Sequence, residues 1–182
     1  MDATIEKSFE IEEPIEKVWA NLSNPMEIAS CVPGAAINEK IDDTHYKGEV
    51  TLKFGPIKTQ YDGEIELIEV DDEKFKMVLG GKGLDSKGKG SADMKMYGDL
   101  EQLDSATKVN FKMNVTIIGT IAQFGSRLIN DVSDQLLNQF ISNFKSQLAG
   151  QEFDNSLSAG SMMGSVIKNK IGGIFKGKEE TA

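Results

Sequence analysis

The fold is decided by residues 109–148, with the sequence VNFKMNVTIIGTIAQFGSRLINDVSDQLLNQFISNFKSQL, because one hydrophobic pattern replaces another there. Up to Ile117 the apolar residues alternate with polar ones, which is typical of a strand with one buried face. After Gly119 they are spaced by threes and fours over about 30 residues, which predicts one long amphipathic helix. The helical series is Ile121, Phe124, Leu128, Val132, Leu136, Phe140 and Phe144.

The same alternation runs through four segments that precede this stretch. Turn-forming sequences separate them, as expected for antiparallel hairpins with one buried face. The opposite sides of these segments are rich in Lys, Glu and Asp, which predicts contact with water. The turns are Asp42-Asp43, Gly55-Pro56, Asp71-Asp72-Glu73 and Asp104-Ser105, and the apolar sides are Tyr46, Val50, Leu52 and Phe54; Tyr61, Ile65 and Leu67; Phe75, Met77 and Leu79; and Ala92, Met94 and Met96.

Two short helices are predicted after a first strand at residues 3–11. Pro14 fits the first turn of one helix, and Asn24-Pro25 begins the other, which ends before Pro33-Gly34. The order is therefore a strand, two small helices, about six more strands and a long closing helix. It predicts an α+β helix-grip (START-like) fold, in which a curved antiparallel sheet of about seven strands surrounds the C-terminal helix.

The 182 residues suit one ligand-binding domain over residues 1–150, followed by a polar linker and a short basic tail over 151–182. The tail combines apolar residues with lysines, so we expect it to contact an anionic membrane or a partner. Packing on its own domain and an irregular end are the alternatives. The predicted contact residues are Met162, Met163, Val166, Ile167, Lys168, Lys170, Ile171, Ile174 and Phe175.

Composition excludes several classes of protein. The net charge of −9 argues against binding to nucleic acid through phosphates. A single cysteine and an N-terminus without a basic start and apolar run predict a cytoplasmic protein. Because no apolar run reaches the roughly 18 residues of a membrane-spanning helix, any membrane contact is expected to be peripheral.

Catalytic and metal-binding residues are not expected. Cys31 would need a base to act as a nucleophile, and the only histidine, His45, is placed at the start of a strand. One cysteine and one histidine also leave no zinc-binding set. Residues 83–90 come close to a phosphate-binding loop, but Gly90 stands where Ser or Thr should contact magnesium, and a strand follows instead of a helix.

An internal apolar cavity is the predicted functional site. A curved sheet around a helix either packs tightly or leaves a tunnel, and the pattern permits both. Methionines are flexible and polarizable, so those on the apolar sides of the strands suit an extended apolar ligand, with Tyr61, Tyr97 or Gln123 orienting a head group. The predicted lining residues are Trp19, Leu52, Phe54, Tyr61, Ile65, Met77, Leu79, Met94, Met96, Phe111, Met113, Phe124, Leu128, Val132 and Leu136.

Several motifs in fixed order resemble those of a known family, over about residues 1–148. They are Asn24-Pro25, Cys31-Val32-Pro33-Gly34-Ala35, Tyr46-Lys47-Gly48, Phe54-Gly55-Pro56-Ile57-Lys58, Tyr61-Asp62-Gly63, Gly88-Lys89-Gly90-Ser91-Ala92 and residues 119–129. This pattern is similar to the CoxG-like family, the G subunits of carbon monoxide dehydrogenase, which belongs to the SRPBCC superfamily.

The resemblance implies a non-catalytic accessory protein with an apolar cavity. It implies a quinone or similar lipid as a non-covalent ligand, no metal or covalent cofactor, and a role in recruiting molybdenum hydroxylases of the carbon monoxide dehydrogenase type to the membrane. The expected partners are therefore a hydrophobic small molecule, molybdenum hydroxylase subunits and a peripheral membrane surface. The alternatives are a helix-grip enzyme that uses the cavity, and a pure protein adaptor without a ligand.

Overall fold

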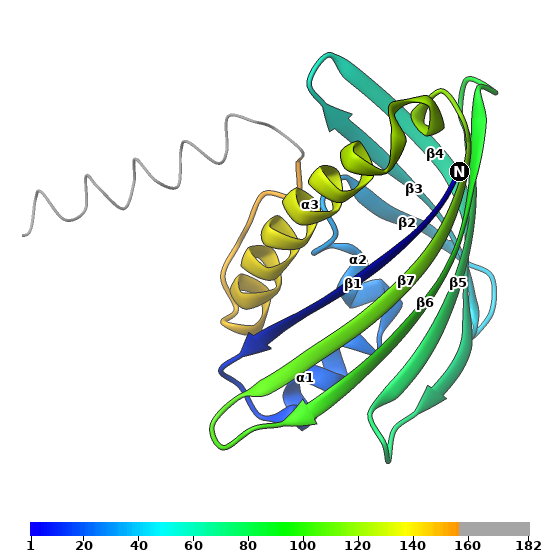
Figure 1. Cartoon of the computed structure of the whole chain (residues 1–182). Coiled ribbons are helices and arrows are strands. Elements are labelled where there is room, and N and C mark those ends of the chain that lie inside the picture. Colours follow the sequence, from blue (N-terminus) through cyan, green and yellow to red (C-terminus); the bar gives the residue numbers. More distant parts are fainter. Residues whose placement is uncertain (157–182) are drawn as a thin grey trace, which may run out of the picture.

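A seven-stranded antiparallel sheet curves around a long helix in the computed structural model, which describes residues 1–156 (Figure 1). The strand order is β1-β7-β6-β5-β4-β3-β2, so the first strand pairs with the last and β2 lies at the other edge. The elements are β1 (Asp2–Ile11), α1 (Ile15–Leu22), α2 (Pro25–Ala29), β2 (Ala35–Lys40), β3 (His45–Phe54), β4 (Ile57–Asp71), β5 (Lys76–Asp85), β6 (Gly90–Gln102), β7 (Thr107–Gly119), the 3-10 helix η1 (Ile121–Phe124) and α3 (Gly125–Leu148). The predicted helix-grip architecture is confirmed.

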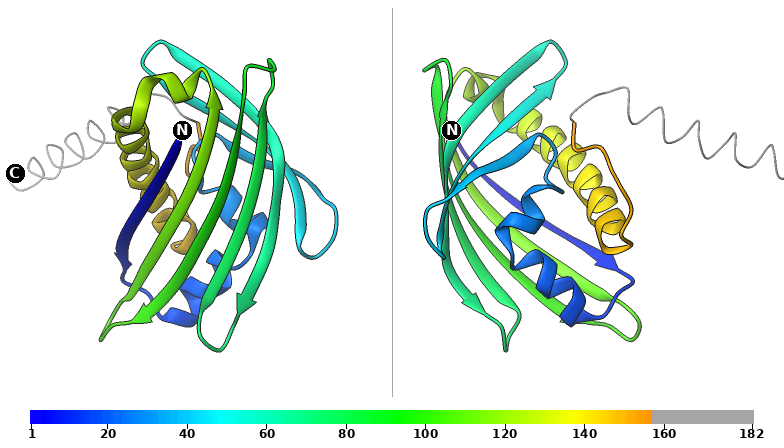
Figure 2. Two further views of the ribbon diagram at one scale, coloured as in Figure 1. Left: turned by 45° about the vertical axis from the view of Figure 1, so that its right-hand side comes forward. Right: turned by 180° about the vertical axis from the view of Figure 1, so that it is seen from behind.

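Glycines permit the sheet to bend at one row across three strands. Gly48 pairs with Gly63, and Gly63 pairs with Gly83. A Cβ atom at Gly63 would lie 2.1 Å from the carbonyl oxygen of Lys82, which is closer than any side chain allows. Only glycine therefore fits at Gly48 and Gly63, and the strands curve around α3 there (Figure 2).

The two short helices form as predicted and cover one end of the concave face (Figure 2). In α1, Ile15, Val18 and Trp19 are buried. The side-chain oxygen of Asn24 caps α2 by accepting a hydrogen bond from the Met26 backbone N–H at 3.1 Å. Trp19 Nε1 donates to Asp72 Oδ1 in the β4–β5 turn at 2.8 Å, which ties α1 to the sheet.

The closing helix differs from the prediction of one continuous helix. Gly125 has a φ of 75°, a left-handed conformation that separates η1 from α3. Phe124 precedes this break and is 48% exposed. The period of three and four residues continues across Gly125, so the spacing alone gives no sign of the interruption.

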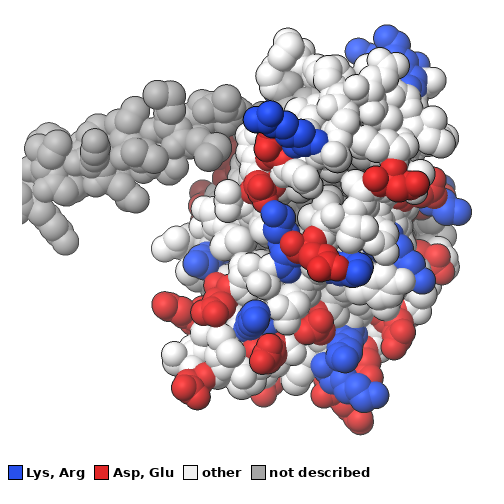
Figure 3. Space-filling model, viewed as in Figure 1, with Lys and Arg blue, Asp and Glu red and all other residues white. Residues whose placement is uncertain are grey.

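Two hydrophobic cores lie between the sheet and the helices. The helix-end core, beneath α1, α2 and the C-terminal part of α3, contains Ile11, Ile15, Val18, Trp19, Cys31, Met77, Leu100, Val109, Phe144 and Leu148. The hairpin-end core, near η1, contains Ile5, Tyr61, Ile117, Ile121 and Ile129. On the face in Figure 3, which is viewed as in Figure 1, the acidic residues lie mainly on the lower, helix-capped part of the molecule.

The chain continues to pack against the sheet after α3. Phe153 contacts the helix-end core. The backbone N–H of Gly34 donates to the Asn155 carbonyl at 3.0 Å, and Asn155 Nδ2 donates to the Ala35 carbonyl at 3.1 Å. The packed chain therefore extends beyond residue 150 to Ser156. The predicted contact residues of the tail lie outside the described residues.

Candidate ligand-binding cavity

An apolar cavity of about 260 Å³ lies between the sheet and α3, close to the helix-end core. Strands β1, β5, β6 and β7 form one wall, and α3 forms the other through residues such as Leu136 and Phe140. Trp19 of α1, together with Ile28 and Pro33 in and after α2, closes one side. Side chains from distant sequence positions, which only the complete fold brings together, thus line this partly open cavity.

The polar residues of the lining are already hydrogen-bonded. Ser133 Oγ donates to the Ile129 carbonyl at 2.6 Å. Asp99 and Asn110 alternate with the inward-facing residues of their strands, so their side chains belong to the opposite face of the sheet, where Asn110 Nδ2 donates to Asp99 Oδ2 at 3.0 Å. Because no lining side chain requires a polar partner, the cavity favours an apolar ligand.

Three methionines and a glycine give the strand wall an adaptable shape. Met77, Met96 and Met113 come from three strands, and Met96 pairs with Met113 in the β6–β7 register. Gly98 leaves room beside them, since a Cβ atom there would make an ordinary 3.6 Å contact with Met77 Cγ. Methionine changes rotamer at low cost, so this wall can adjust to ligands of different shape.

The structure brings six of the predicted cavity residues to this site and places the others elsewhere. Those that line it are Trp19, Met77, Met96, Phe111, Met113 and Leu136. Leu79 packs against the helix-end core, and Tyr61 belongs to the hairpin-end core. The side chain of Met94 lies over Gly81. Four others are partly buried but do not line the cavity: Leu52, Ile65, Leu128 and Val132. Phe124 is exposed on η1, and the side chain of Phe54 is not among those described.

Sequence reasoning missed the contributions of β1 and α2 and predicted only Leu136 of the α3 residues that line the cavity. Ile5 and Phe9 lie on the inward side of β1, and Ile28, Val32 and Pro33 lie in and after α2. Their apolar character was visible, but the sheet order that brings β1 next to β7 was not. Leu137 and Phe140 of α3 also line the cavity.

The residues considered for a polar head group do not face the cavity. Tyr61 is buried in the hairpin-end core, and burial raises its pKa. Tyr97 lies on the outer face of β6, 41% exposed, with Lys95 Nζ 5.4 Å from its ring centroid. Gln123 is exposed on η1. A ligand in this cavity is therefore held by apolar contacts.

Cys31 and His45 lie in separate environments. Cys31 is fully buried, and its Sγ lies 2.7 Å from Gln147 Oε1. Burial raises the pKa of this thiol, which favours the unreactive protonated form. His45 Nδ1 is 3.0 Å from the carboxylate oxygens of Asp42, in an exposed position at the start of β3. Within residues 1–156 no group of His, Cys, Asp and Glu is arranged to hold a metal ion.

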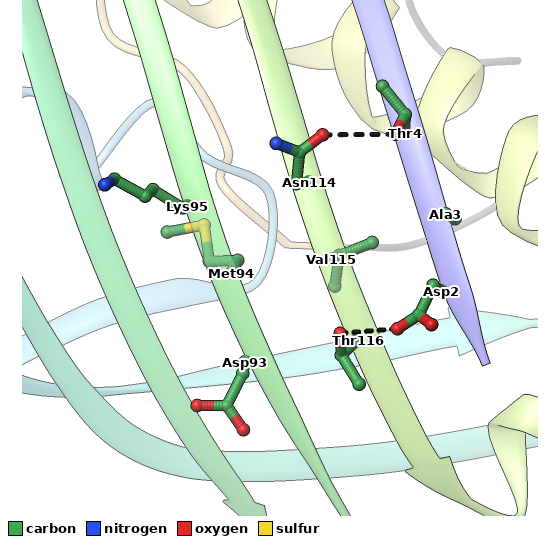
Figure 4. A pocket seen from close by; sticks show the side chains of 9 residues that line it. All are labelled: Asp2, Ala3, Thr4, Asp93, Met94, Lys95, Asn114, Val115 and Thr116. Carbon is green, nitrogen blue, oxygen red and sulfur yellow. Dashed lines mark hydrogen bonds between the residues drawn. The ribbon is translucent and has the colours of Figure 1, made fainter.

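A shallow hollow on the convex face of β1, β7 and β6 is larger, about 470 Å³, but only the outer side of the sheet forms it (Figure 4). Two pairs of its side chains are hydrogen-bonded: Thr4 Oγ1 donates to Asn114 Oδ1 at 3.1 Å, and Thr116 Oγ1 donates to Asp2 Oδ1 at 2.6 Å. Since the cavity between the sheet and α3 lies between two layers and has a largely apolar lining, it is the better candidate site.

A curved antiparallel sheet around a C-terminal helix, with an apolar cavity between them, defines a helix-grip protein. The sequence profile of CoxG, the G subunit of carbon monoxide dehydrogenase, matches residues 8–149. The chain therefore belongs to the CoxG family, as its motifs indicated. No curated protein sequence matches it.

Solved structures support the same fold. A conserved protein from Geobacillus kaustophilus is 22% identical with a TM-score of 0.72, covering 82% of this chain and 96% of that chain. A protein from Rhizobium leguminosarum is 12% identical with a TM-score of 0.59, covering 83% and 97%. The Zhui aromatase/cyclase from Streptomyces sp. R1128 is 11% identical with a TM-score of 0.50, covering 82% and 93%. No helix within residues 1–156 has the length and apolar character to cross a membrane.

Proposed function

We propose that this protein is a non-catalytic accessory protein that binds an isoprenoid quinone or another hydrophobic lipid and links a molybdenum hydroxylase of the carbon monoxide dehydrogenase type to the membrane. The observation that carries the proposal is the cavity between the sheet and α3, whose lining side chains are apolar or already hydrogen-bonded. Each square ångström of ligand surface that leaves water there contributes about 25 cal/mol, which favours a large apolar ligand.

The cavity size favours partial enclosure of such a ligand. Its volume of about 260 Å³ is slightly below the range of about 300–1,000 Å³ common for small-molecule sites. A ring or the first isoprenoid units would fit, and movement of Met77, Met96 and Met113 would admit more. The rest of a long chain would extend along the partly buried concave face, beside Ile65 and Val132.

The family supports the choice of partner. The CoxG family is named for a component of carbon monoxide dehydrogenase, so a protein of this family is expected to associate with such an enzyme. A non-catalytic role agrees with the burial of Cys31, which raises the pKa of its thiol, and with its partner: Cys31 contacts Gln147, whereas His45 contacts Asp42.

Mass spectrometry of apolar extracts tests the ligand directly. The full chain, purified from cells that make menaquinone, should carry quinone or another lipid. Gly98→Leu places a larger side chain in the cavity and should remove the ligand, whereas Gly98→Ala fits the available space and should retain it. Extracts without quinone or lipid, together with no rise in melting temperature on adding menaquinone, would refute lipid binding.

The link to the hydroxylase needs a separate measurement. Co-purification of the tagged chain with molybdenum hydroxylase subunits from its own cells, followed by fractionation into membrane and soluble pools, measures both contacts. Deleting the gene should move the hydroxylase from the membrane to the soluble fraction. An unchanged distribution of the hydroxylase would contradict the linking role while leaving lipid binding intact.

A further inference from the structure

The end of the sheet opposite α1 and α2 carries basic residues in an otherwise acidic chain. This hairpin end consists of residues 51–60, 84–92 and 117–130, which form the β3–β4 and β5–β6 hairpin tips, η1 and the start of α3. Its charged residues are Lys53, Lys58, Asp85, Lys87, Lys89 and Arg127, a net charge of +4 in a chain of −9. On the face in Figure 3, this upper end shows lysine or arginine among uncharged residues.

The five basic side chains are exposed and free to bind an anionic surface. None of them forms an ion pair with another residue of the described chain. Lys53 and Lys58 are directly paired across β3 and β4, an arrangement of like charges that destabilises a hairpin. The repulsion between the two lysines is explained if both contact negative charge outside the protein.

Three acidic residues near this end accept hydrogen bonds within the protein. Asp85 Oδ2 accepts a hydrogen bond from Thr59 Oγ1 at 2.7 Å, and its Oδ1 accepts one from the Lys87 backbone N–H at 2.7 Å. Glu49 and Asp62 border the tips on the outer face, and both accept hydrogen bonds from Gln60 Nε2. Hydrogen bonds within the protein therefore occupy these three carboxylates.

Large apolar side chains are exposed at the same end. Leu84 is 68% exposed and Ile118 is 60% exposed, the two highest values for large hydrophobic residues within residues 1–156. Ser91 pairs with both of them, so the two side chains lie in one row across β5, β6 and β7. Phe124 on η1 is 48% exposed. Apolar side chains among unpaired cations suit the interface between lipid head groups and acyl chains.

We propose that the hairpin end docks on an anionic lipid bilayer, with Lys53, Lys58 and Lys87 contacting lipid phosphates and Leu84 and Ile118 entering the interfacial layer. This proposal rests on the membrane role proposed above and assigns it to a surface of the folded domain. A lipid bilayer is favoured over an acidic protein because exposed cations and exposed apolar side chains lie at the same end, an arrangement that suits the interface between lipid head groups and acyl chains.

Sedimentation of the full chain with phosphatidylglycerol vesicles tests the surface. At about 1 kcal/mol per basic residue, Lys53→Gln/Lys58→Gln/Lys87→Gln should weaken binding on the order of a hundredfold. The matched control is Lys76→Gln/Lys108→Gln/Lys145→Gln, which makes the same charge change at the opposite end and should bind as the wild type does. Neutral phosphatidylcholine vesicles should bind none of the three proteins.

The outcomes separate the two proposals. Equal binding by both triple variants would overturn docking through the hairpin end but keep the membrane role. Wild-type protein that does not sediment with anionic vesicles would overturn both the docking surface and the membrane link, while lipid extraction still tests the cavity. The hairpin variant should melt no lower than the wild type, since it removes the repulsion between Lys53 and Lys58.

Discussion

The two ends of the molecule differ in how the concave side of the sheet is covered. At the helix end, α1, α2 and the C-terminal half of α3 close over the sheet, and Phe144 and Val18 are fully buried. At the hairpin end only η1 and the start of α3 lie over the concave side, and Leu84 and Ile118 are largely exposed on the opposite, convex side.

The two ends also differ in the partners of their basic residues. Some lysines at the helix end pair with nearby acids, as in the Lys17–Glu13 pair at 2.9 Å and the Lys74–Asp71 pair at 3.5 Å. Lys76, Lys108 and Lys145 form no ion pair among the described residues. The basic residues at the hairpin end have no such partners among the described residues. We infer that the helix end maintains the fold and the cavity, whereas the hairpin end is shaped for contact with another surface.

The same substitution at each end gives the largest expected contrast. Phe144→Ala removes a fully buried ring that stacks on Phe140 with centroids 5.7 Å apart. It should lower the free energy of unfolding by about 3–5 kcal/mol, as core Phe→Ala changes do. Phe124→Ala at the exposed position should cost less than about 1 kcal/mol. Urea unfolding measures both, and similar losses would contradict the division between the two ends.

Shortening the C-terminus should also affect the helix end. A chain ending at Gly150 lacks Phe153 and the two hydrogen bonds of Asn155, one through its carbonyl and one through its side chain, that a chain ending at Ser156 retains. Loss of these contacts should reduce the free energy of unfolding by about 2–4 kcal/mol relative to the longer chain. Equal denaturation midpoints for the two chains would show that this segment does not stabilise the domain.

The hydrogen bond between Trp19 and Asp72 should have a smaller effect. Asp72→Ala leaves the indole N–H without its carboxylate partner, so it should cost about 1–2 kcal/mol and change the emission of the single tryptophan. Glu73→Ala is the matched control, because the hydrogen bonds found for Glu73 involve its backbone N–H. An unchanged emission spectrum in the Asp72 variant would contradict the contact.

His45 provides the smallest expected effect, outside both cores. Its hydrogen bond to Asp42 favours the charged imidazolium and raises the pKa of His45 above 6.5, while the same turn lowers the pKa of Asp42. The resulting stabilisation is present below pH 6.5 and is lost as the pH rises through the raised pKa of His45. NMR titration should show a drop in this pKa in Asp42→Asn, and no drop would exclude the pair.

Sequence reasoning succeeded where a pattern is local. Alternation located β3 to β7, Asn24-Pro25 located α2, and the spacing after Gly119 located α3. The break at Gly125 was not predictable, because a left-handed glycine leaves the spacing of apolar residues unchanged. Strand β2 was not identified individually, since the sequence AAINEK has few apolar residues.

The cavity was harder to predict because it depends on strand order and depth. Leu52 and Ile65 share the inward side with Met96 and Met113, yet the bend at the glycine row places the cavity beside only some of the strands. Alternation specifies a face, but it does not specify how far α3 extends over that face. Predicting that the inward residues of β1 line the cavity would have required knowing that β1 pairs with β7.

The most direct test of the central claim is a titration of menaquinone into the wild type, Gly98→Leu and Gly98→Ala, followed by the fluorescence of Trp19. Trp19 lines the cavity and is the only tryptophan, so its emission reports on what the cavity contains. We expect saturable quenching in the wild type and in Gly98→Ala, and none in Gly98→Leu. Equal quenching in all three proteins, or none in the wild type, would contradict a lipid site in this cavity.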